Sequence, residues 1–106
     1  MTTLSEQEFR TKSDEVLQAA RQTLLRLADQ EGFEVELQNG VLDLVFEEPR
    51  EAKFVVSPNA PVRQIWVSAM ARSYKLSWTP EHGNFALNGE PLPTLLERLT
   101  REFLAS

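Results

Sequence analysis

The chain has 106 residues, 42% of them hydrophobic and 25% charged, which predicts one packed domain over residues 1–106 rather than a disordered chain. It has no cysteine and one histidine, which excludes disulfides, thiolate metal sites and multi-histidine metal centres. With 11 basic and 16 acidic residues the net charge is −5, so we do not expect a protein that binds nucleic acid. No apolar run reaches the ~18 residues of a membrane span and no signal peptide opens the sequence, so we expect a cytoplasmic protein without membrane contact.

Acidic residues are concentrated in one part of the chain. The segment from Asp29 to Glu51 contains a single basic residue, Arg50. Such a segment gives an acidic surface that attracts cations or a basic partner. Its eight acids are Asp29, Glu31, Glu34, Glu36, Asp43, Glu47, Glu48 and Glu51.

The first predicted element is a helix over residues 5–30. Ser5 and Glu8 have the spacing of a capping box, in which each side chain bonds the backbone of the other residue. Gly32 is a suitable end signal, because glycine readily takes the left-handed conformation that closes a helix. The apolar stripe of this helix consists of Phe9, Val16, Leu17, Ala20, Leu24, Leu27 and Ala28.

Beyond Gly32 the apolar residues alternate with polar ones, which is the period of half-buried strands. Asn39-Gly40 is a strong signal for a two-residue hairpin turn. Pro58 and Pro61 indicate a loop over residues 57–61, because proline cannot donate to a strand ladder. The expected strands are 33–37, 42–46, 52–57, 64–68 and 74–78, with a short sixth at 85–87.

The chain ends in a second amphipathic helix. Pro93 suits its first turn, and the leucines that follow recur at helical spacing. Short hairpin connections favour antiparallel pairing, and the one-sided alternation favours a sheet with one face in water. We therefore predict an α+β two-layer sandwich, with the N- and C-terminal helices on one face of an antiparallel sheet of five or six strands.

One predicted strand carries a tryptophan at its centre. If Ile65 and Val67 face the core, Trp66 faces solvent together with Gln64 and Ser68. An exposed indole on a rigid strand is typical of an interface anchor. In the other interpretation the tryptophan is half-buried beneath a long neighbouring side chain such as Arg72 or Arg63.

These features together resemble the frataxin family, including its bacterial members. The most specific part is Gln64-Ile65-Trp66-Val67-Ser68, which follows the loop at Pro61. The resemblance extends over residues 8–104. Further agreement lies in Asn39-Gly40-Val41-Leu42, in Tyr74, and in Gly89-x-x-Leu92-x-x-Leu95-Leu96.

The resemblance implies an accessory protein of iron–sulfur cluster assembly. Its partners would be the cysteine desulfurase and the scaffold protein, and it would modulate their activity without being an enzyme. Ferroxidase activity is not expected, because the chain lacks a di-iron set of carboxylates and histidines. A monomer is expected, with iron-dependent oligomers left open. The partner-binding residues implied by position are Gln64, Trp66, Ser68 and Arg72, with Arg63 and Lys75 as further basic neighbours.

The resemblance also implies weak binding of Fe²⁺ or Fe³⁺ on exposed carboxylates, with no organic cofactor. Oxygen ligands suit ferrous iron in a chain without thiols. Arg21 and Arg26 depart from the family pattern, in which the later turns of the first helix are rich in acids, and their charges would repel iron. The metal-binding residues implied by position are Asp14, Glu15, Asp29, Glu31, Glu34 and Glu36.

A second function is compatible with the same fold. In this alternative the domain is a metal-free interaction module, and its acidic face serves only solubility and the steering of partners. Glu34 and Glu36 would then be ordinary solvated side chains that also protect a strand from edge pairing.

Overall fold

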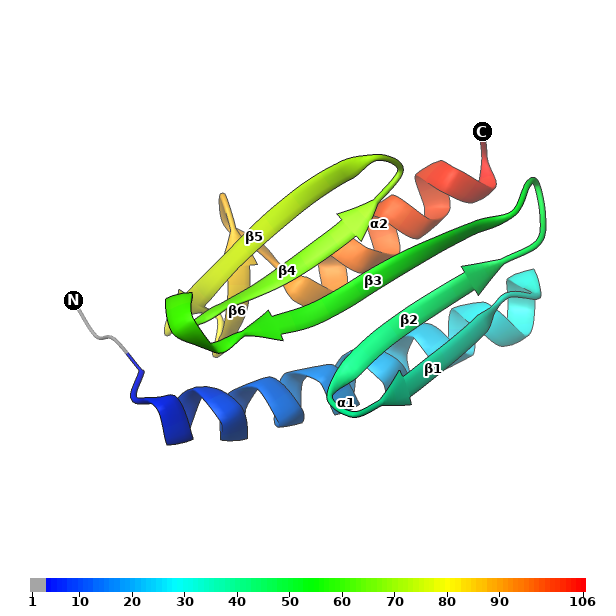
Figure 1. Cartoon of the computed structure of the whole chain (residues 1–106). Coiled ribbons are helices and arrows are strands. Elements are labelled where there is room, and N and C mark those ends of the chain that lie inside the picture. Colours follow the sequence, from blue (N-terminus) through cyan, green and yellow to red (C-terminus); the bar gives the residue numbers. More distant parts are fainter. Residues whose placement is uncertain (1–3) are drawn as a thin grey trace.

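The structure, a computed structural model, describes residues 4–106 and confirms the α+β sandwich (Figure 1). Two helices lie under one face of a seven-stranded antiparallel sheet whose strands follow one another in chain order. No helix or loop of the described residues covers the other face, which we call the open face. The elements are α1 (Glu6–Glu31), β1 (Glu34–Gln38), β2 (Val41–Phe46), β3 (Ala52–Asn59), a 3₁₀ turn (Ala60–Val62), β4 (Gln64–Ala69), β5 (Arg72–Thr79), β6 (Asn84–Leu87), β7 (Glu90–Pro91) and α2 (Leu92–Leu104).

The first helix begins and ends where the sequence predicts. Ser5 Oγ accepts a hydrogen bond from the Glu8 amide at 3.1 Å, and the Ser5 amide donates to Glu8 Oε1 at 3.0 Å. The Ser5 amide, and then the Ser5 hydroxyl, lower the pKa of the Glu8 carboxyl. At the other end Gly32 has a φ of 85°, so the capping box and the glycine stop are both confirmed.

The core lies between the sheet and the two helices, and its densest part is a group of aromatic rings around Phe46. This side chain is 1% exposed. Its ring centroid lies 4.8 Å from that of Phe33, 4.9 Å from that of Phe54 and 4.7 Å from that of Phe103. These rings come from the chain before β1, from β2 and β3, and from α2, so the cluster joins the last helix to the first three strands.

The sequence predicts five or six strands, whereas the sheet has seven, and the strand that was missed is β7. Asn88 and Gly89 have φ values of 51° and 81°, the left-handed pair that a two-residue hairpin turn requires. The chain therefore folds back, and Leu87 pairs with Glu90. The Asn-Gly signal applied to the first hairpin could have identified this turn as well.

The prediction of a loop over residues 57–61 is wrong in its first half. Pro58 lies within β3 and is paired with Ile65 of β4. The pairing of β3 with β2 ends at Val56, so Pro58 has a neighbouring strand on one side only. Proline is tolerated there because no partner on the free side needs its missing N–H.

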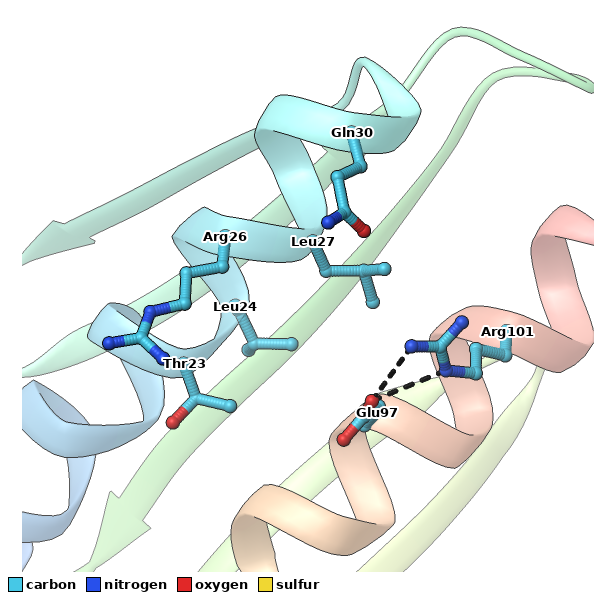
Figure 2. A pocket seen from close by; sticks show the side chains of 7 residues that line it. All are labelled: Thr23, Leu24, Arg26, Leu27, Gln30, Glu97 and Arg101. Atoms are coloured by element: carbon cyan, nitrogen blue, oxygen red, sulfur yellow. Dashed lines mark hydrogen bonds and ion pairs between the residues drawn. The ribbon is translucent and has the colours of Figure 1, made fainter.

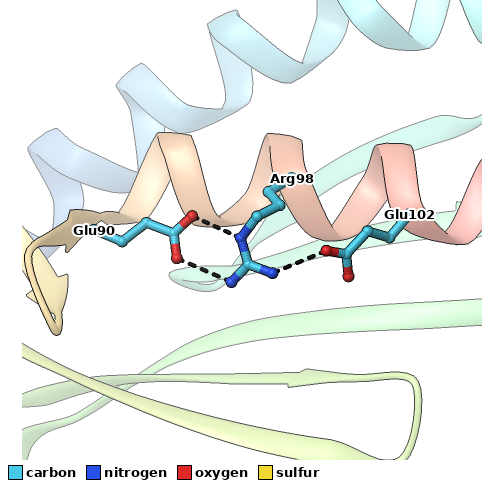
Figure 3. A network of polar contacts seen from close by, with 3 residues as sticks. All are labelled: Glu90, Arg98 and Glu102. Atoms are coloured by element: carbon cyan, nitrogen blue, oxygen red, sulfur yellow. Dashed lines mark hydrogen bonds and ion pairs between the residues drawn. The ribbon is translucent and has the colours of Figure 1, made fainter.

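An ion-pair network holds β7 to α2 (Figure 3). Arg98 donates through Nε to Glu90 Oε2 at 2.8 Å and through Nη2 to Glu90 Oε1 at 2.9 Å. Its Nη1 donates to Glu102 Oε2 at 2.9 Å. The hydrogen bonds from Arg98 lower the pKa of the Glu90 carboxyl. This network fixes the short last strand against the helix that follows it.

Neither α1 nor α2 is both long and apolar enough to cross a membrane, in the part of the chain that the structure describes.

Candidate functional site

The open face carries Trp66, as the strand alternation predicts. Ile65 and Val67 are 0% and 1% exposed and face the helices. Trp66 lies between them and therefore projects from the opposite side of β4. Its direct neighbours across the sheet are Ser57 of β3 and Lys75 of β5.

The indole of Trp66 is half-buried and held by polar contacts. Its Nε1 donates to Gln64 Oε1 at 2.9 Å. The ammonium nitrogen of Lys75 lies 4.8 Å from the centroid of the ring. Half-burial was the alternative interpretation, but the covering residue is Lys75, because the register places it directly opposite Trp66. The tryptophan is thus preset in one orientation.

A depression of about 370 Å³ adjoins the indole on the open face. Serine hydroxyl groups and the Lys75 ammonium can form hydrogen bonds with a partner there. Val55 and the indole of Trp66 form an apolar part of the same depression. No carboxylate lines it. The lining residues are Val55, Ser57, Trp66, Val67, Ser68, Ser73 and Lys75. We call this depression, together with Gln64, the docking face.

The two arginines expected beside Trp66 lie elsewhere. Arg63 Nε donates to the carbonyl of Leu4 at 3.2 Å, and its Nη1 donates to the carbonyl of Ala60. It therefore fastens the start of the chain to the 3₁₀ turn. Arg72 is paired with Ala69, which is 2% exposed and faces the core, so Arg72 leaves the sheet on the helix side. The prediction that Arg72 shares a face with Gln64, Trp66 and Ser68 is wrong in this respect.

Glu34 and Glu36 lie on the open face at the β1 edge of the sheet. Both are exposed, while Val35 between them packs toward the core. Glu36 is directly opposite Asp43 of β2, and the Asp43 carboxylate lies 3.6 Å from the Lys53 ammonium. Asp43 was not among the predicted metal ligands. The cross-strand register brings Asp43 to the same edge as Glu36, and this register could be read from the Asn39-Gly40 turn.

The predicted carboxylates on the first helix do not join this edge. Asp14 and Glu15 lie in the middle of α1, and Asp29 lies about 22 Å further along the helix axis, as 15 residues at ~1.5 Å each require. Glu15 is 3.9 Å from the Lys12 ammonium, and Glu31 is the last residue of α1. Among residues 4–106, no three carboxylate or imidazole groups come together as a metal site. The six predicted ligands therefore lie in three separate places, two within α1, two at the end of α1 and two on β1.

The surface of the two helices has mixed charge around Arg26, one of the two arginines that depart from the family pattern. A groove of about 230 Å³ between α1 and α2 is lined by Arg26 and by the pair Glu97 and Arg101 (Figure 2). Arg101 Nη2 donates to Glu97 Oε1 at 2.9 Å. The Arg26 side chain points away from this pair. The groove is thus lined by two arginines and one glutamate, a poor environment for a cation.

Comparisons with known proteins agree with this architecture. A family model described as a frataxin-like domain matches residues 2–105. The iron-sulfur cluster assembly protein CyaY of Pseudomonas aeruginosa is 30% identical over 92 residues, which cover 83% of each chain. The protein of the same name from Ectopseudomonas mendocina is 28% identical over 103 residues, 93% of this chain and 88% of the relative. That from Pseudomonas syringae pv. tomato is 28% identical over 92 residues, 83% of this chain and 82% of the relative.

Proposed function

Because the chain belongs to the frataxin family, we propose that it is an accessory protein of iron–sulfur cluster assembly. It binds the cysteine desulfurase and its scaffold protein through the docking face and modulates their activity, without catalysing a reaction itself. The relatives' names support the pathway. The observation that carries the choice of surface is the preset indole of Trp66 on the open face.

The geometry of Trp66 suits an interface anchor. Its hydrogen bond to Gln64 and the Lys75 ammonium over its ring restrict the rotamers of the indole before any partner arrives. Binding therefore costs less side-chain entropy than it would for a free tryptophan. Burying the remaining apolar surface of the ring gains free energy, as is common for tryptophan at the centre of protein interfaces.

The acidic edge of the open face supplies a steering charge. Glu34 and Glu36 are exposed, and they lie on the open face of the sheet, as the docking face does. Such an edge accelerates encounter with a basic surface on the desulfurase complex, and salt weakens the effect. The proposed interface thus combines one aromatic anchor with an acidic border.

We further propose that iron is weakly bound cargo at this edge. Alternate residues on one strand face are ~7 Å apart, close enough for Glu34 and Glu36 to share an ion through water. Asp43 lies opposite Glu36 and adds negative charge to this edge without completing a three-carboxylate site, and Lys53 offsets part of its charge. Binding is weak because these side chains are exposed and not preorganised. Bound iron would reduce the negative charge that meets the partner.

Replacing Trp66 by alanine tests the docking face. We expect Trp66→Ala to weaken binding to an immobilised cysteine desulfurase–scaffold complex by about 10- to 100-fold, as truncation of an aromatic anchor typically does. Biolayer interferometry gives the affinity, and circular dichroism shows whether the variant is still folded. Thr23→Ala on the exposed side of α1 is the matched control and should bind as the wild type does. Equal affinity of Trp66→Ala and the wild type, or no binding by either, would contradict the proposal.

A metal titration separates the iron carrier from the metal-free interaction module. Adding Fe²⁺ without oxygen, or Co²⁺ as a stand-in, should change amide NMR signals around residues 34–36 and 43. The double variant Glu34→Lys/Glu36→Lys should abolish these changes, whereas Asp14→Asn should keep them. Unchanged spectra at millimolar metal would sink the iron proposal and favour the metal-free module.

A further inference from the structure

The backbone on the outer side of β1 has no partner strand. β1 is the first strand in the sheet order, and among the described residues it pairs only with β2 (Figure 1). Its other side is therefore an edge of the sheet. The backbone groups of an edge strand can bind a further extended segment through hydrogen bonds.

The two-residue turn after β1 determines which residues offer these groups. Gln38 and Val41 flank the turn and form the hydrogen-bonded pair that closes it. Hydrogen-bonded and non-hydrogen-bonded pairs alternate along an antiparallel ladder. Leu37 and Val35 are therefore the positions whose N–H and C=O groups point away from β2. No other backbone group of residues 4–106 is hydrogen-bonded to them from outside the sheet.

A depression of about 300 Å³ lies beside this edge, between α1 and the end of β1. Leu37 is half-buried on the helix side of β1, and Leu17 of α1 is 1% exposed, so these two side chains form an apolar floor. A strand added to the edge would place alternate side chains on this side of the sheet, over the depression. The lining residues are Asp14, Leu17, Gln18, Leu37, Asn39 and Gly40.

The charge on the open face of β1 indicates which strand fits the edge. Glu34 and Glu36 are exposed, and neither forms an ion pair with another described residue. Opposite charges on neighbouring strands are favourable, whereas like charges directly opposite each other are destabilising. The strand that fits therefore has lysine or arginine at the positions that face these two glutamates.

The same charges disfavour a second copy of this chain at the edge. In an antiparallel pair of two β1 strands that bonds Val35 of one copy to Leu37 of the other, Glu36 faces Glu36. Such like-charge pairs are a common protection of edge strands against self-association. The net charge of −5 adds a general repulsion between copies.

We propose that the edge of β1 binds an extended segment of a partner protein in which basic residues alternate with small β-branched ones. The segment continues the sheet beyond β1 through hydrogen bonds to the backbone of Val35 and Leu37. Its basic side chains face Glu34 and Glu36, and its β-branched side chains lie over the depression, where a threonine methyl group contacts Leu37. This contact goes beyond the steering role of the glutamates, which needs no bond to the backbone, and it does not depend on the docking face.

Hydrogen exchange measured by NMR tests the backbone contact. The probe is a peptide of about seven residues that alternates lysine and threonine, long enough to span a typical strand. In the free protein the Val35 and Leu37 amides should exchange rapidly, whereas the Glu36 amide is protected by its bond to β2. Saturating peptide should slow exchange at Val35 and Leu37 by at least about tenfold. Unchanged exchange at these two amides would overturn the proposal.

Two control peptides separate strand addition from a general attraction of charges. In the first, the backbone nitrogens that face the edge are methylated, so the side chains and charge are kept but the donors are lost. In the second, the same lysines are grouped at one end, so the alternation is lost. Each should bind at least about tenfold more weakly in an NMR titration, which corresponds to about 1.4 kcal/mol. Equal affinity of all three peptides would contradict the proposal.

A charge reversal on the protein tests the choice of a basic segment. Glu36→Lys should bind the alternating peptide at least about fivefold more weakly at physiological salt, because two like charges then face each other. Glu81→Lys makes the same change of charge at an exposed position of the β5–β6 turn and is the matched control. It should bind as the wild type does. Equal binding by Glu36→Lys and Glu81→Lys would count against the basic segment.

The remaining outcomes separate this inference from its rivals and from the proposed function. A doubled mass in sedimentation, with Val35 protected in the absence of peptide, would make a second copy the occupant and overturn the proposal. Trp66→Ala should bind the peptide with wild-type affinity. If the peptide does not bind but Trp66→Ala loses the desulfurase–scaffold complex, the edge contact fails and the docking face is retained. Peptide binding by a protein that does not bind that complex gives the reverse conclusion.

Discussion

Replacing Phe46 by alanine should cost about 3–5 kcal/mol of the free energy of unfolding, a large part of the 5–15 kcal/mol typical of a small domain. The side chain is 1% exposed and its ring contacts those of Phe33, Phe54 and Phe103. Its removal leaves a cavity between rigid rings from separate elements, which cannot easily collapse to fill the space. Urea denaturation followed by circular dichroism measures the loss.

The neighbouring residue provides the control for that experiment. Val45 is half-buried and lies on the open face of the same strand. Val45→Ala should lower the free energy of unfolding by less than about 1 kcal/mol, because little buried surface and no closed cavity are involved. A loss of under 1 kcal/mol in Phe46→Ala would mean that the ring cluster does not join the last helix to the sheet.

A charge introduced on the core side of β4 should destabilise the domain far more than the same charge on its open side. Val67 is 1% exposed beneath the helices, so Val67→Asp buries an unpaired carboxylate and should destabilise the domain by about 4 kcal/mol or more. Ser68, the next residue, is exposed on the open face, and Ser68→Asp should change stability by less than about 0.5 kcal/mol. Thermal and urea denaturation of the two variants measure the difference. Similar losses in both would contradict the assignment of the open face.

Local sequence patterns were sufficient to predict most of the fold. The capping box at Ser5 and the stop at Gly32 determine the ends of α1 through contacts within a few residues. The alternation around Trp66 determines which side of β4 faces the core, because successive side chains point to opposite faces. Such signals depend on chemistry between near neighbours, and the structure confirms each of them.

Contacts between distant segments could not be predicted in the same way. Lys75 covers Trp66 because of the register between β4 and β5. The turn that joins these strands consists of Met70 and Ala71, with φ values of 50° and 63°, and is not a recognisable Asn-Gly pair. Arg72 was expected beside Trp66, although the same register assigns it to the other side of the sheet.

The candidate metal ligands show a related limit. Asp14 and Asp29 belong to one helix but lie about 22 Å apart along its axis, at ~1.5 Å per residue. Glu34 and Glu36 are close to Asp29 in sequence, but strand alternation directs them to the open face, away from the helix layer. A run of acids in the sequence therefore does not imply one acidic site, because a turn between a helix and a strand redistributes its members.

The two tryptophans provide the most direct test of the docking face. Both are half-buried and each lies beneath a lysine, with Lys12 5.5 Å from the ring of Trp78 and Lys75 4.8 Å from that of Trp66. They lie on opposite sides of the sheet, because Trp78 packs against Phe85 in the core. Oxidation by hydroxyl radicals, quantified by mass spectrometry with and without the desulfurase–scaffold complex, should fall severalfold at Trp66 and remain unchanged at Trp78. Protection of Trp78 with unchanged oxidation of Trp66 would contradict binding through the open face.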